Sequence, residues 1–180
     1  MLGSAFDALP GVRPLDLYPE ALRTEIDAVN ARVYDDVSNG VYKAGFATEQ
    51  APFEDAARTL FAALDNLEAR LGKQRWLVGG VFTEADVRLF TTLVSFDAVY
   101  HGHFKCNLRR LQDYPNLWAW TREIAQFDAV RETIDLQHIQ RHYYESQRTV
   151  NPTGVHPIGP AIDFDAPHDR NRLAGHTLAA

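Results

Sequence analysis

Apolar residues recur at alternating steps of four and three along one stretch of the chain, and this spacing constrains the fold most. Steps of three and four place side chains on one face of an α-helix, whereas a half-buried strand needs strict alternation. Gly72 follows the last of these residues and predicts the helix end. Thr48 is expected at the N-cap, with Glu49 near the positive end of the helix dipole. The apolar positions are Phe53, Ala57, Leu60, Leu64, Leu67 and Leu71.

A second amphipathic stretch precedes this helix and runs from about Pro19 to Asn39. Pro19 suits a first helical turn, and the Asn39-Gly40 pair is typical of a helix that ends through a left-handed cap. We therefore expect "NGVYKAGFAT" to form a loop that carries Tyr42, and the two flanking helices to pack antiparallel. The apolar stripe of the first helix comprises Leu22, Ile26, Val29, Val33 and Val37.

The third helical stretch has a marked N-terminus in "VFTEADVRLF". The Thr83 hydroxyl can accept a hydrogen bond from the Asp86 amide while the Asp86 carboxylate accepts one from the Thr83 amide, which is a capping box. Phe82 and Val87 are placed for a hydrophobic staple. Apolar residues then surround most of the helix, so we expect it to be central and buried. These residues are Leu89, Phe90, Leu93, Val94, Phe96 and Val99.

The last part of the chain predicts two further helices and an extended tail. The helices span about 115–127 and 135–146. From Arg148 onward, repeated prolines and glycines prevent a long helix, but apolar residues between them favour packing against the bundle. No stretch alternates as a strand would. We expect an all-α helical bundle over 15–147 and an extended Pro/Gly-rich tail over 148–180.

Composition excludes several functional classes. The net charge of -6 and the sequence pI near 5.6 give no clustered positive charge for nucleic acid or an anionic membrane. Cys106 is the single cysteine, which excludes an internal disulfide and a multi-cysteine zinc site. No stretch is long and apolar enough to span a bilayer, and no signal peptide is evident. We expect a cytoplasmic protein.

Four segments carry a family resemblance: "NGVYKAGFAT", "TEADVRLFTTLVSFDAVYHGHFKCN", "DYPNL" and "HYYESQRTVNPTG". The Thr-x-x-Asp box with its staple resembles the C-terminal domain of cytosolic glutathione transferases. The Tyr-Lys-Ala-Gly-Phe and Asn-Pro-Thr-Gly stretches are similar to one branch, the glutathionyl-hydroquinone reductases or Xi class. The resemblance extends from Met1 to about Arg170.

The chain departs from this family in one respect that bears on activity. Family members carry a nucleophilic cysteine, in a Cys-Pro context, on an N-terminal thioredoxin-like domain that binds glutathione, and no such motif occurs here. Residues 1–14 resemble the end of the last helix of that domain and a linker. Cys106 matches a position outside the glutathione site, and Ser95 stands where many relatives have a basic residue. We therefore expect this chain to be inactive alone.

The resemblance implies a reaction in which glutathione is removed from a glutathionyl-hydroquinone and oxidised glutathione is released. Tyr42 and Tyr143 match the family positions that face the aromatic substrate, and they are the candidate catalytic and substrate-binding residues. Both can instead be packing residues whose hydroxyls meet a backbone carbonyl. Lys43 is a further candidate that can attract glutathione carboxylates, or can be a solvated lysine. Members of this family form dimers through the helical domain, so the resemblance implies a homodimer.

Histidines suggest a metal site only weakly. His138 and His142 lie four residues apart on one predicted helix face, but no third ligand joins them at a recognisable spacing. His101, His103 and Cys106 have the same weakness. We therefore expect no metal, and glutathione as the co-substrate. Two hypotheses follow: the chain is the substrate-binding domain of a glutathione-dependent reductase, or it is a stand-alone, non-catalytic dimerisation or interaction module.

Overall fold

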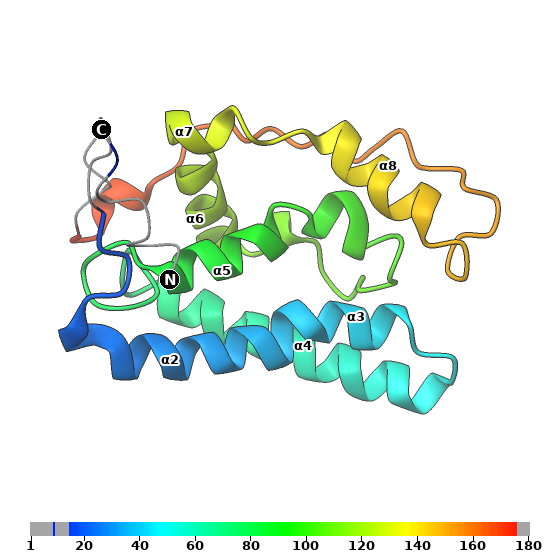
Figure 1. Cartoon of the computed structure of the whole chain (residues 1–180), viewed down its shortest axis with the longest axis horizontal. Coiled ribbons are helices and arrows are strands. Elements are labelled where there is room, and N and C mark those ends of the chain that lie inside the picture. Colours follow the sequence, from blue (N-terminus) through cyan, green and yellow to red (C-terminus); the bar gives the residue numbers. More distant parts are fainter. Residues whose placement is uncertain (1–8, 10–14, 176–180) are drawn as a thin grey trace.

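The protein is described here by a computed structural model that covers Leu9 and residues 15–175. The expected helix remnant and linker over 1–14 therefore lie outside the described residues, apart from Leu9. Helices pack into a bundle without any strand in this part of the chain, in agreement with the all-α prediction (Figure 1). No helix within residues 15–175 combines the length and apolarity that a membrane span requires.

The first helical rod is longer than the sequence predicts. It continues past Asn39 to Gly45, so the expectation of a helix end at Asn39-Gly40, with Tyr42 in a loop, is wrong. Val41 and Ala44 extend the buried apolar face, and the packing of this face outweighs the local end signal. The rod comprises η1 (Glu20–Leu22), α2 (Arg23–Arg32), the π-helical turn η2 (Val33–Ser38) and α3 (Asn39–Gly45).

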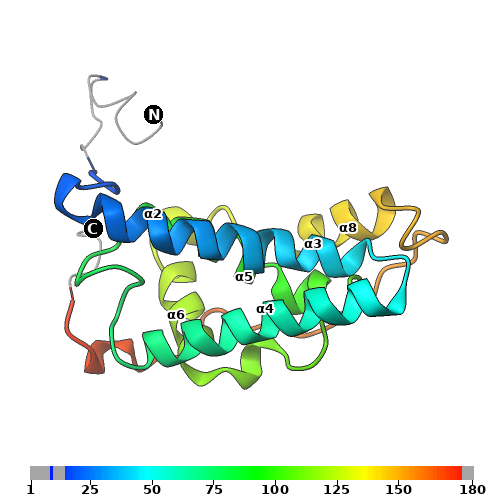
Figure 2. The ribbon, with the colours of Figure 1, turned by 90° about the horizontal axis from the view of Figure 1, so that it is seen from below.

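Helix α4 (Gln50–Leu71) returns alongside this rod, as the views of Figures 1 and 2 show. The antiparallel prediction and the end at Gly72 are confirmed. The N-cap prediction is wrong by one residue, because the Phe53 amide donates to the Glu49 carbonyl at 3.3 Å and Glu49 holds the N-cap position. The Glu49 side chain makes no capping hydrogen bond.

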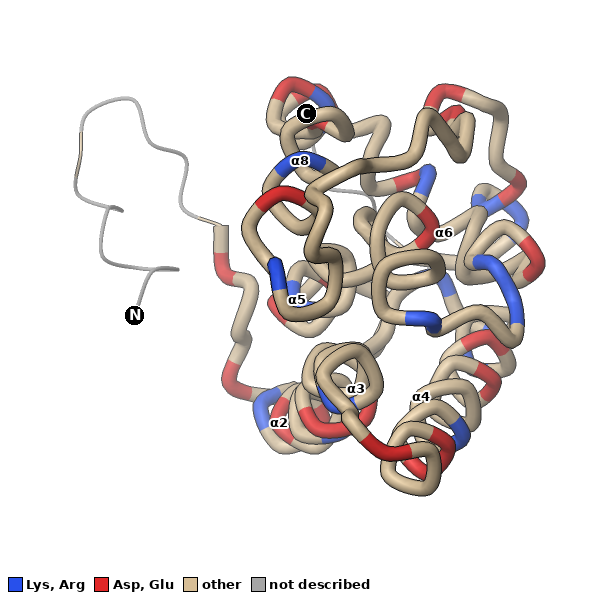
Figure 3. Tube along the Cα trace, turned by 90° about the vertical axis from the view of Figure 1, so that its right-hand side faces the viewer, with Lys and Arg blue, Asp and Glu red and all other residues tan. Residues whose placement is uncertain are grey.

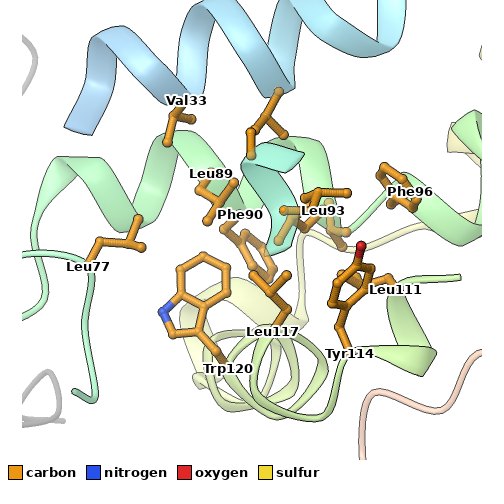
Figure 4. Close-up of a cluster of buried hydrophobic side chains, with 14 of the residues drawn as sticks. Val33, Leu77, Leu89, Phe90, Leu93, Phe96, Leu111, Tyr114, Leu117 and Trp120 are labelled. Carbon is orange, nitrogen blue, oxygen red and sulfur yellow. The ribbon is translucent and has the colours of Figure 1, made fainter. Parts of the chain in front are cut away.

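Helix α5 (Glu84–Leu93) and the π-helical turn η3 (Phe96–Tyr100) lie at the centre of the bundle. Phe90 and Leu93 of α5 face Leu117 and Trp120 of the next helix, with Val33 on the other side (Figure 4). Burial on several sides agrees with the expected central position. Burying one such large apolar side chain contributes roughly 1.5–3 kcal/mol.

The remaining helices follow the predicted order. Helix α6 (Pro115–Ala125) ends two residues before the predicted boundary, and α8 (Leu136–Ser146) starts at the Asp135 cap, whose side chain accepts the His138 amide at 2.9 Å. Two short turns were not predicted, η4 (Leu111–Asp113) and α7 (Asp128–Arg131).

The C-terminal segment from Arg148 to Gly175 consists of turns and extended stretches, with the short 3-10 turn η5 (Arg170–Arg172) as its one helical element. The buried Arg170 guanidinium attaches this segment to the end of α4, where it donates to the carbonyls of Leu71 at 2.7 Å and Arg75 at 2.6 Å. Acidic and basic residues are mixed along α4 rather than separated by sign (Figure 3).

Candidate functional site

Two tyrosines from distant parts of the sequence meet beside α3 and α8. The hydroxyl oxygens of Tyr42 and Tyr143 lie 2.7 Å apart, within hydrogen-bond distance. Tyr42 projects from α3 rather than from a loop, and Tyr143 projects from α8. The structure therefore brings together the two phenols that the sequence analysis selected.

A third tyrosine, Tyr100, joins them and was missed from the sequence. Its hydroxyl lies 2.8 Å from that of Tyr143, and its side chain is buried at the end of η3. Sequence reasoning assigned this stretch to the core on its apolar pattern. A tyrosine in place of phenylalanine was the available signal, since a buried phenol usually needs a hydrogen-bond partner. We refer to Tyr42, Tyr100 and Tyr143 as the tyrosine cluster.

The tyrosine cluster has more O–H donors than short hydroxyl–hydroxyl bonds. Each phenol has one O–H hydrogen, so the three residues provide three donors. Hydrogen bonds of 2.7 and 2.8 Å join the Tyr143 hydroxyl to those of Tyr42 and Tyr100, and Tyr42 also interacts with Tyr100 and adds to the rise in its pKa. Two of the three O–H hydrogens serve the two short bonds, so the third can turn to an acceptor on a bound molecule.

Burial raises the pKa of two of these phenols, Tyr143 and Tyr100. It raises the pKa of Tyr143 to about 12, with the Tyr100 hydrogen bond opposing this change and the Tyr42 hydrogen bond adding to it. Burial, followed by the hydrogen bond to Tyr143, also raises the pKa of Tyr100. At neutral pH Tyr100 and Tyr143 therefore carry their O–H hydrogens and no charge.

One edge of the cluster is open to solvent. Tyr42 is 36% exposed and Phe46, one helical turn further on, is 47% exposed. Their rings are stacked with centroids 6.2 Å apart. Phe104 lies on the buried side, with its ring centroid 5.3 Å from that of Tyr42. An aromatic ring could therefore approach from the Tyr42 and Phe46 side and meet a phenol hydroxyl there.

Lys43 is not part of the tyrosine cluster. It follows Tyr42 on α3, and a one-residue step turns the side chain by about 100° around a helix. Its ammonium donates to the Asp35 carbonyl at 2.9 Å. The structure therefore does not bring Lys43 together with the phenol hydroxyls.

Thr83 and Asp86 form the capping box at the start of α5. Asp86 is fully buried and accepts four hydrogen bonds, from the Leu77 amide at 2.9 Å, the Trp120 indole at 3.2 Å, and the amide and hydroxyl of Thr83 at 3.0 and 3.2 Å. Burial raises the pKa of Asp86 to about 6, and these hydrogen bonds oppose the increase. The site holds three segments together and has no exposed edge.

Cys106 is unsuited to nucleophilic chemistry. Its side chain is fully buried, and burial raises the pKa of the thiol to about 12, with Lys105 opposing. Arg109 and Arg110, which follow Cys106 in the sequence, pair with carboxylates, Arg109 with Asp65 at 2.6 Å and Arg110 with Asp113 at 2.8 Å.

The histidines lie in two different settings. His103 is buried and its Nε2 lies 2.9 Å from the Gln147 side-chain oxygen, which joins the loop after η3 to α8. His138 and His142 lie exposed on α8. Among the described residues, no three His, Cys, Asp or Glu side chains are grouped to hold a metal ion.

Comparison with known proteins gives the same family from sequence and from structure. Residues 42–123 match the family model described as "Glutathione S-transferase, C-terminal domain". The chain is 55% identical over 161 residues to glutathionyl-hydroquinone reductase PcpF of Sphingobium chlorophenolicum, covering 89% of this chain and 51% of PcpF. It is 50% identical over 171 residues to glutathionyl-hydroquinone reductase YqjG of Escherichia coli, covering 95% of this chain and 52% of YqjG.

Solved structures of glutathione transferases share the fold of this chain. The glutathione-bound structure of E. coli YqjG has a TM-score of 0.91 and covers 95% of this chain and 55% of that chain at 50% identity. The Xi glutathione transferase of Phanerochaete chrysosporium has a TM-score of 0.88 and covers 94% of this chain and 58% of that chain at 49% identity.

The chain spans about half the length of the curated relatives it matches. Within that span the helical order and the sequence identity point to one class, and the matched domain is the helical one. This chain is therefore homologous, over about half of their length, to the glutathionyl-hydroquinone reductases PcpF and YqjG and to Xi-class glutathione transferases.

Proposed function

We propose that this chain is the substrate-binding part of a glutathione-dependent reductase that removes glutathione from glutathionyl-hydroquinones. The observation that supports this most directly is the tyrosine cluster, which has three O–H donors for two short hydroxyl–hydroxyl bonds and lies beside an exposed aromatic edge. A hydroquinone offers hydroxyl oxygens as acceptors and an aromatic face for stacking. The names of PcpF and YqjG support the same substrate class.

The proposed chemistry needs a thiolate that the described residues do not offer. A cysteine thiolate of a thioredoxin-like domain attacks the glutathione sulfur, the carbon–sulfur bond breaks, and the aromatic carbon takes up a proton. A second glutathione then attacks the mixed disulfide and gives oxidised glutathione and the free cysteine. The buried Cys106, with its raised pKa, does not take this part.

The role proposed for Tyr42 and Tyr143 is to hold the ring hydroxyls of the substrate, with a proton available from the cluster for the leaving carbon. Tyr100 adds to this role through its hydrogen bond to Tyr143. Protonated phenols suit this task, and the raised pKa values of Tyr143 and Tyr100 keep their O–H hydrogens in place at neutral pH. Contact between Lys43 and glutathione carboxylates stays a prediction, and it requires release of the Asp35 carbonyl.

Binding of menadiol, the hydroquinone form of menadione, to the full chain under anaerobic conditions tests the aromatic site. We expect Tyr143→Phe to weaken binding about tenfold, since a lost hydrogen bond to a neutral partner is worth roughly 1–1.5 kcal/mol. Tyr144→Phe is the matched control, because Tyr144 is the next residue on α8 and its ring packs on His103 at 4.5 Å instead. Equal affinity of the two variants would contradict the proposed site.

Turnover of glutathionyl-menadiol with glutathione tests the location of the nucleophile. We expect none from this chain alone, and turnover that survives Cys106→Ser would refute the requirement for a thioredoxin-like domain. Absence of menadiol binding altogether would favour the alternative, a non-catalytic interaction module. A homodimer and a cytoplasmic location belong to the same proposal, and light scattering after size-exclusion chromatography tests the first.

A further inference from the structure

Phe104 is the common neighbour of the aromatic side chains at the candidate site. Its ring centroid lies 5.3 Å from that of Tyr42, 5.6 Å from Tyr100 and 6.1 Å from Tyr143. The Tyr100 contact is stacked, with 16° between the ring planes. Phe104 itself is fully buried. Phe104 therefore forms the buried side of the tyrosine cluster, opposite the exposed edge at Tyr42.

The position of Phe104 depends on the absence of a side chain at Gly45. A Cβ atom added to Gly45 would lie 2.2 Å from Cγ and Cδ1 of Phe104, far inside van der Waals contact. Gly45 ends α3 with a backbone that is not left-handed, so glycine is not needed there for its conformation. Glycine in a helix costs about 1 kcal/mol relative to alanine. The close approach of the Phe104 ring accounts for its presence.

The backbone after Phe104 is also held in an unusual conformation. Lys105 has a φ of 59°, the one positive φ of a non-glycine residue in the part of the chain that the structure describes. Such a conformation costs roughly 1 kcal/mol or more and persists where the surroundings hold it. The Cys106 amide donates to the Tyr100 carbonyl at 3.0 Å and fixes the next residue. The backbone that follows Phe104 is therefore held in place, so a group added at position 45 acts on the Phe104 ring, which also packs against the tyrosines.

We propose that Gly45 and Phe104 form a pair that sets the depth of the aromatic site and thereby the size of ring that the site accepts. This inference rests on the proposed function for its ligand, a hydroquinone. A residue larger than glycine at position 45 displaces the Phe104 ring toward the tyrosine cluster and narrows the site. A smaller side chain at position 104 deepens it and admits a two-ring hydroquinone more readily.

The first test compares two glycines of the same helix. Gly40 is a matched control for Gly45, because a Cβ at Gly40 would meet Leu60 at 3.6 Å, which is ordinary contact. We expect Gly45→Ala to weaken binding of hydroquinone and of 1,4-dihydroxynaphthalene about tenfold or more, and Gly40→Ala to change neither by more than about twofold. Equal binding by Gly45→Ala and Gly40→Ala would overturn the proposal.

The second test uses Phe104 and separates ring size from general damage. We expect Phe104→Leu to favour the two-ring ligand over hydroquinone several-fold relative to the natural chain. The double variant Gly45→Ala/Phe104→Leu should recover most of the binding lost in Gly45→Ala, because leucine leaves room for the added methyl group. If Gly45→Ala fails to fold, Phe104→Leu and the double variant still test whether Phe104 sets the size of ring that binds. Unchanged ligand preference in Phe104→Leu would refute the pair as a size determinant.

A ligand-free measurement distinguishes failure of this inference from failure of the proposed function. Tyrosinate absorbance at 295 nm follows the phenols during a titration to high pH. Displacement of Phe104 in Gly45→Ala should disturb the cluster, so that at least one phenol ionises at lower pH than in the natural chain, whereas Gly40→Ala should leave the curve unchanged. If no chain binds a hydroquinone but the curves differ in this way, the ligand assignment fails and the Gly45–Phe104 contact stands. If the Gly45→Ala curve is unchanged, the inference is wrong.

Discussion

The polar site around Asp86 and the tyrosine cluster both lie within the helical bundle, and they differ in how their hydrogen bonds are satisfied. Asp86 is fully buried, and four donors of the chain occupy both of its oxygens. The tyrosine cluster has two internal hydrogen bonds for three donors and an exposed edge at Tyr42. The Asp86 site therefore has neither a free hydrogen-bonding group nor an exposed edge for a ligand, whereas the tyrosine cluster is exposed and has an O–H donor that can turn to one.

Whether all hydrogen bonds are formed within the chain distinguishes a structural site from a candidate functional site more clearly than the type of residue does. An aspartate with a pKa raised to about 6 would itself suggest acid–base chemistry. Complete satisfaction of its oxygens, deep in the bundle, argues against that role. The phenols are less distinctive as chemical groups, but they retain a donor where a ligand can reach it.

Removal of the Asp86 carboxylate should have the largest effect on stability. Asp86→Ala leaves the Leu77 amide, the Thr83 amide and the Trp120 indole without their acceptor inside the core. We expect the free energy of unfolding to fall by about 4 kcal/mol, because each orphaned buried donor costs roughly 1–3 kcal/mol. Urea denaturation followed by circular dichroism measures this change.

Asp113→Ala is the matched control, since Asp113 is the carboxylate of a second capping box that lies at the surface. Water can replace the lost acceptor there, so we expect a far smaller loss. Similar losses in the two variants would show that burial does not distinguish these carboxylates, and the comparison of the two polar sites would lose its basis.

The Thr83 hydroxyl should have the next largest effect. Thr83→Ala removes the side-chain half of the capping box, and we expect a loss of about 1–2 kcal/mol in the free energy of unfolding. Glu49→Ala at the start of α4 is the control, because the Glu49 side chain makes no capping hydrogen bond. We expect that variant to unfold like the natural chain, and Thr83→Ser to recover most of the lost stability. A loss in Glu49→Ala as large as in Thr83→Ala would mean that helix starts here do not depend on side-chain caps.

The Asp86 site could be predicted from the sequence because its signal is local. Thr83 and Asp86 are three residues apart, and their capping box needs only the helix that they begin. The partners contributed by Leu77 and Trp120 depend on packing and could not be predicted in the same way. Local spacing also gave the course of α4, α6 and α8 to within a few residues.

Two features that the sequence analysis got wrong or missed depend on packing between distant parts of the chain. Asn39 and Gly40 carry a local end signal, but burial of Val41 and Ala44 keeps the chain helical, and Tyr42 therefore lies on a helix. Tyr100 was missed because its partner Tyr143 is 43 residues away and the two meet only when η3 packs against α8. Periodicity describes a helix face, and it contains no information on which face meets which.

The smallest expected effect concerns the tyrosine cluster at alkaline pH. The pKa of Tyr143 in the folded protein is raised to about 12, while in the unfolded chain it is about 10. Because the unfolded chain releases this proton first, the Tyr143 contribution to stability is fully present below pH 10 and is lost as the pH rises toward 12. We expect the free energy of unfolding of the natural chain to approach that of Tyr143→Phe as the pH rises from 9 to 10.5, by less than about 1 kcal/mol.

Urea denaturation of both chains at several pH values in this range measures that convergence. Tyr143→Phe is the appropriate reference, since tyrosines outside the cluster titrate alike in both chains, and the difference reports Tyr143 together with its effect on the hydrogen-bonded Tyr100. A difference that stays constant from pH 9 to 10.5 would mean that Tyr143 ionises as an ordinary exposed phenol. The hydroxyl would then already be in water, and the contrast between an open site with a protected donor and the closed site at Asp86 would no longer hold.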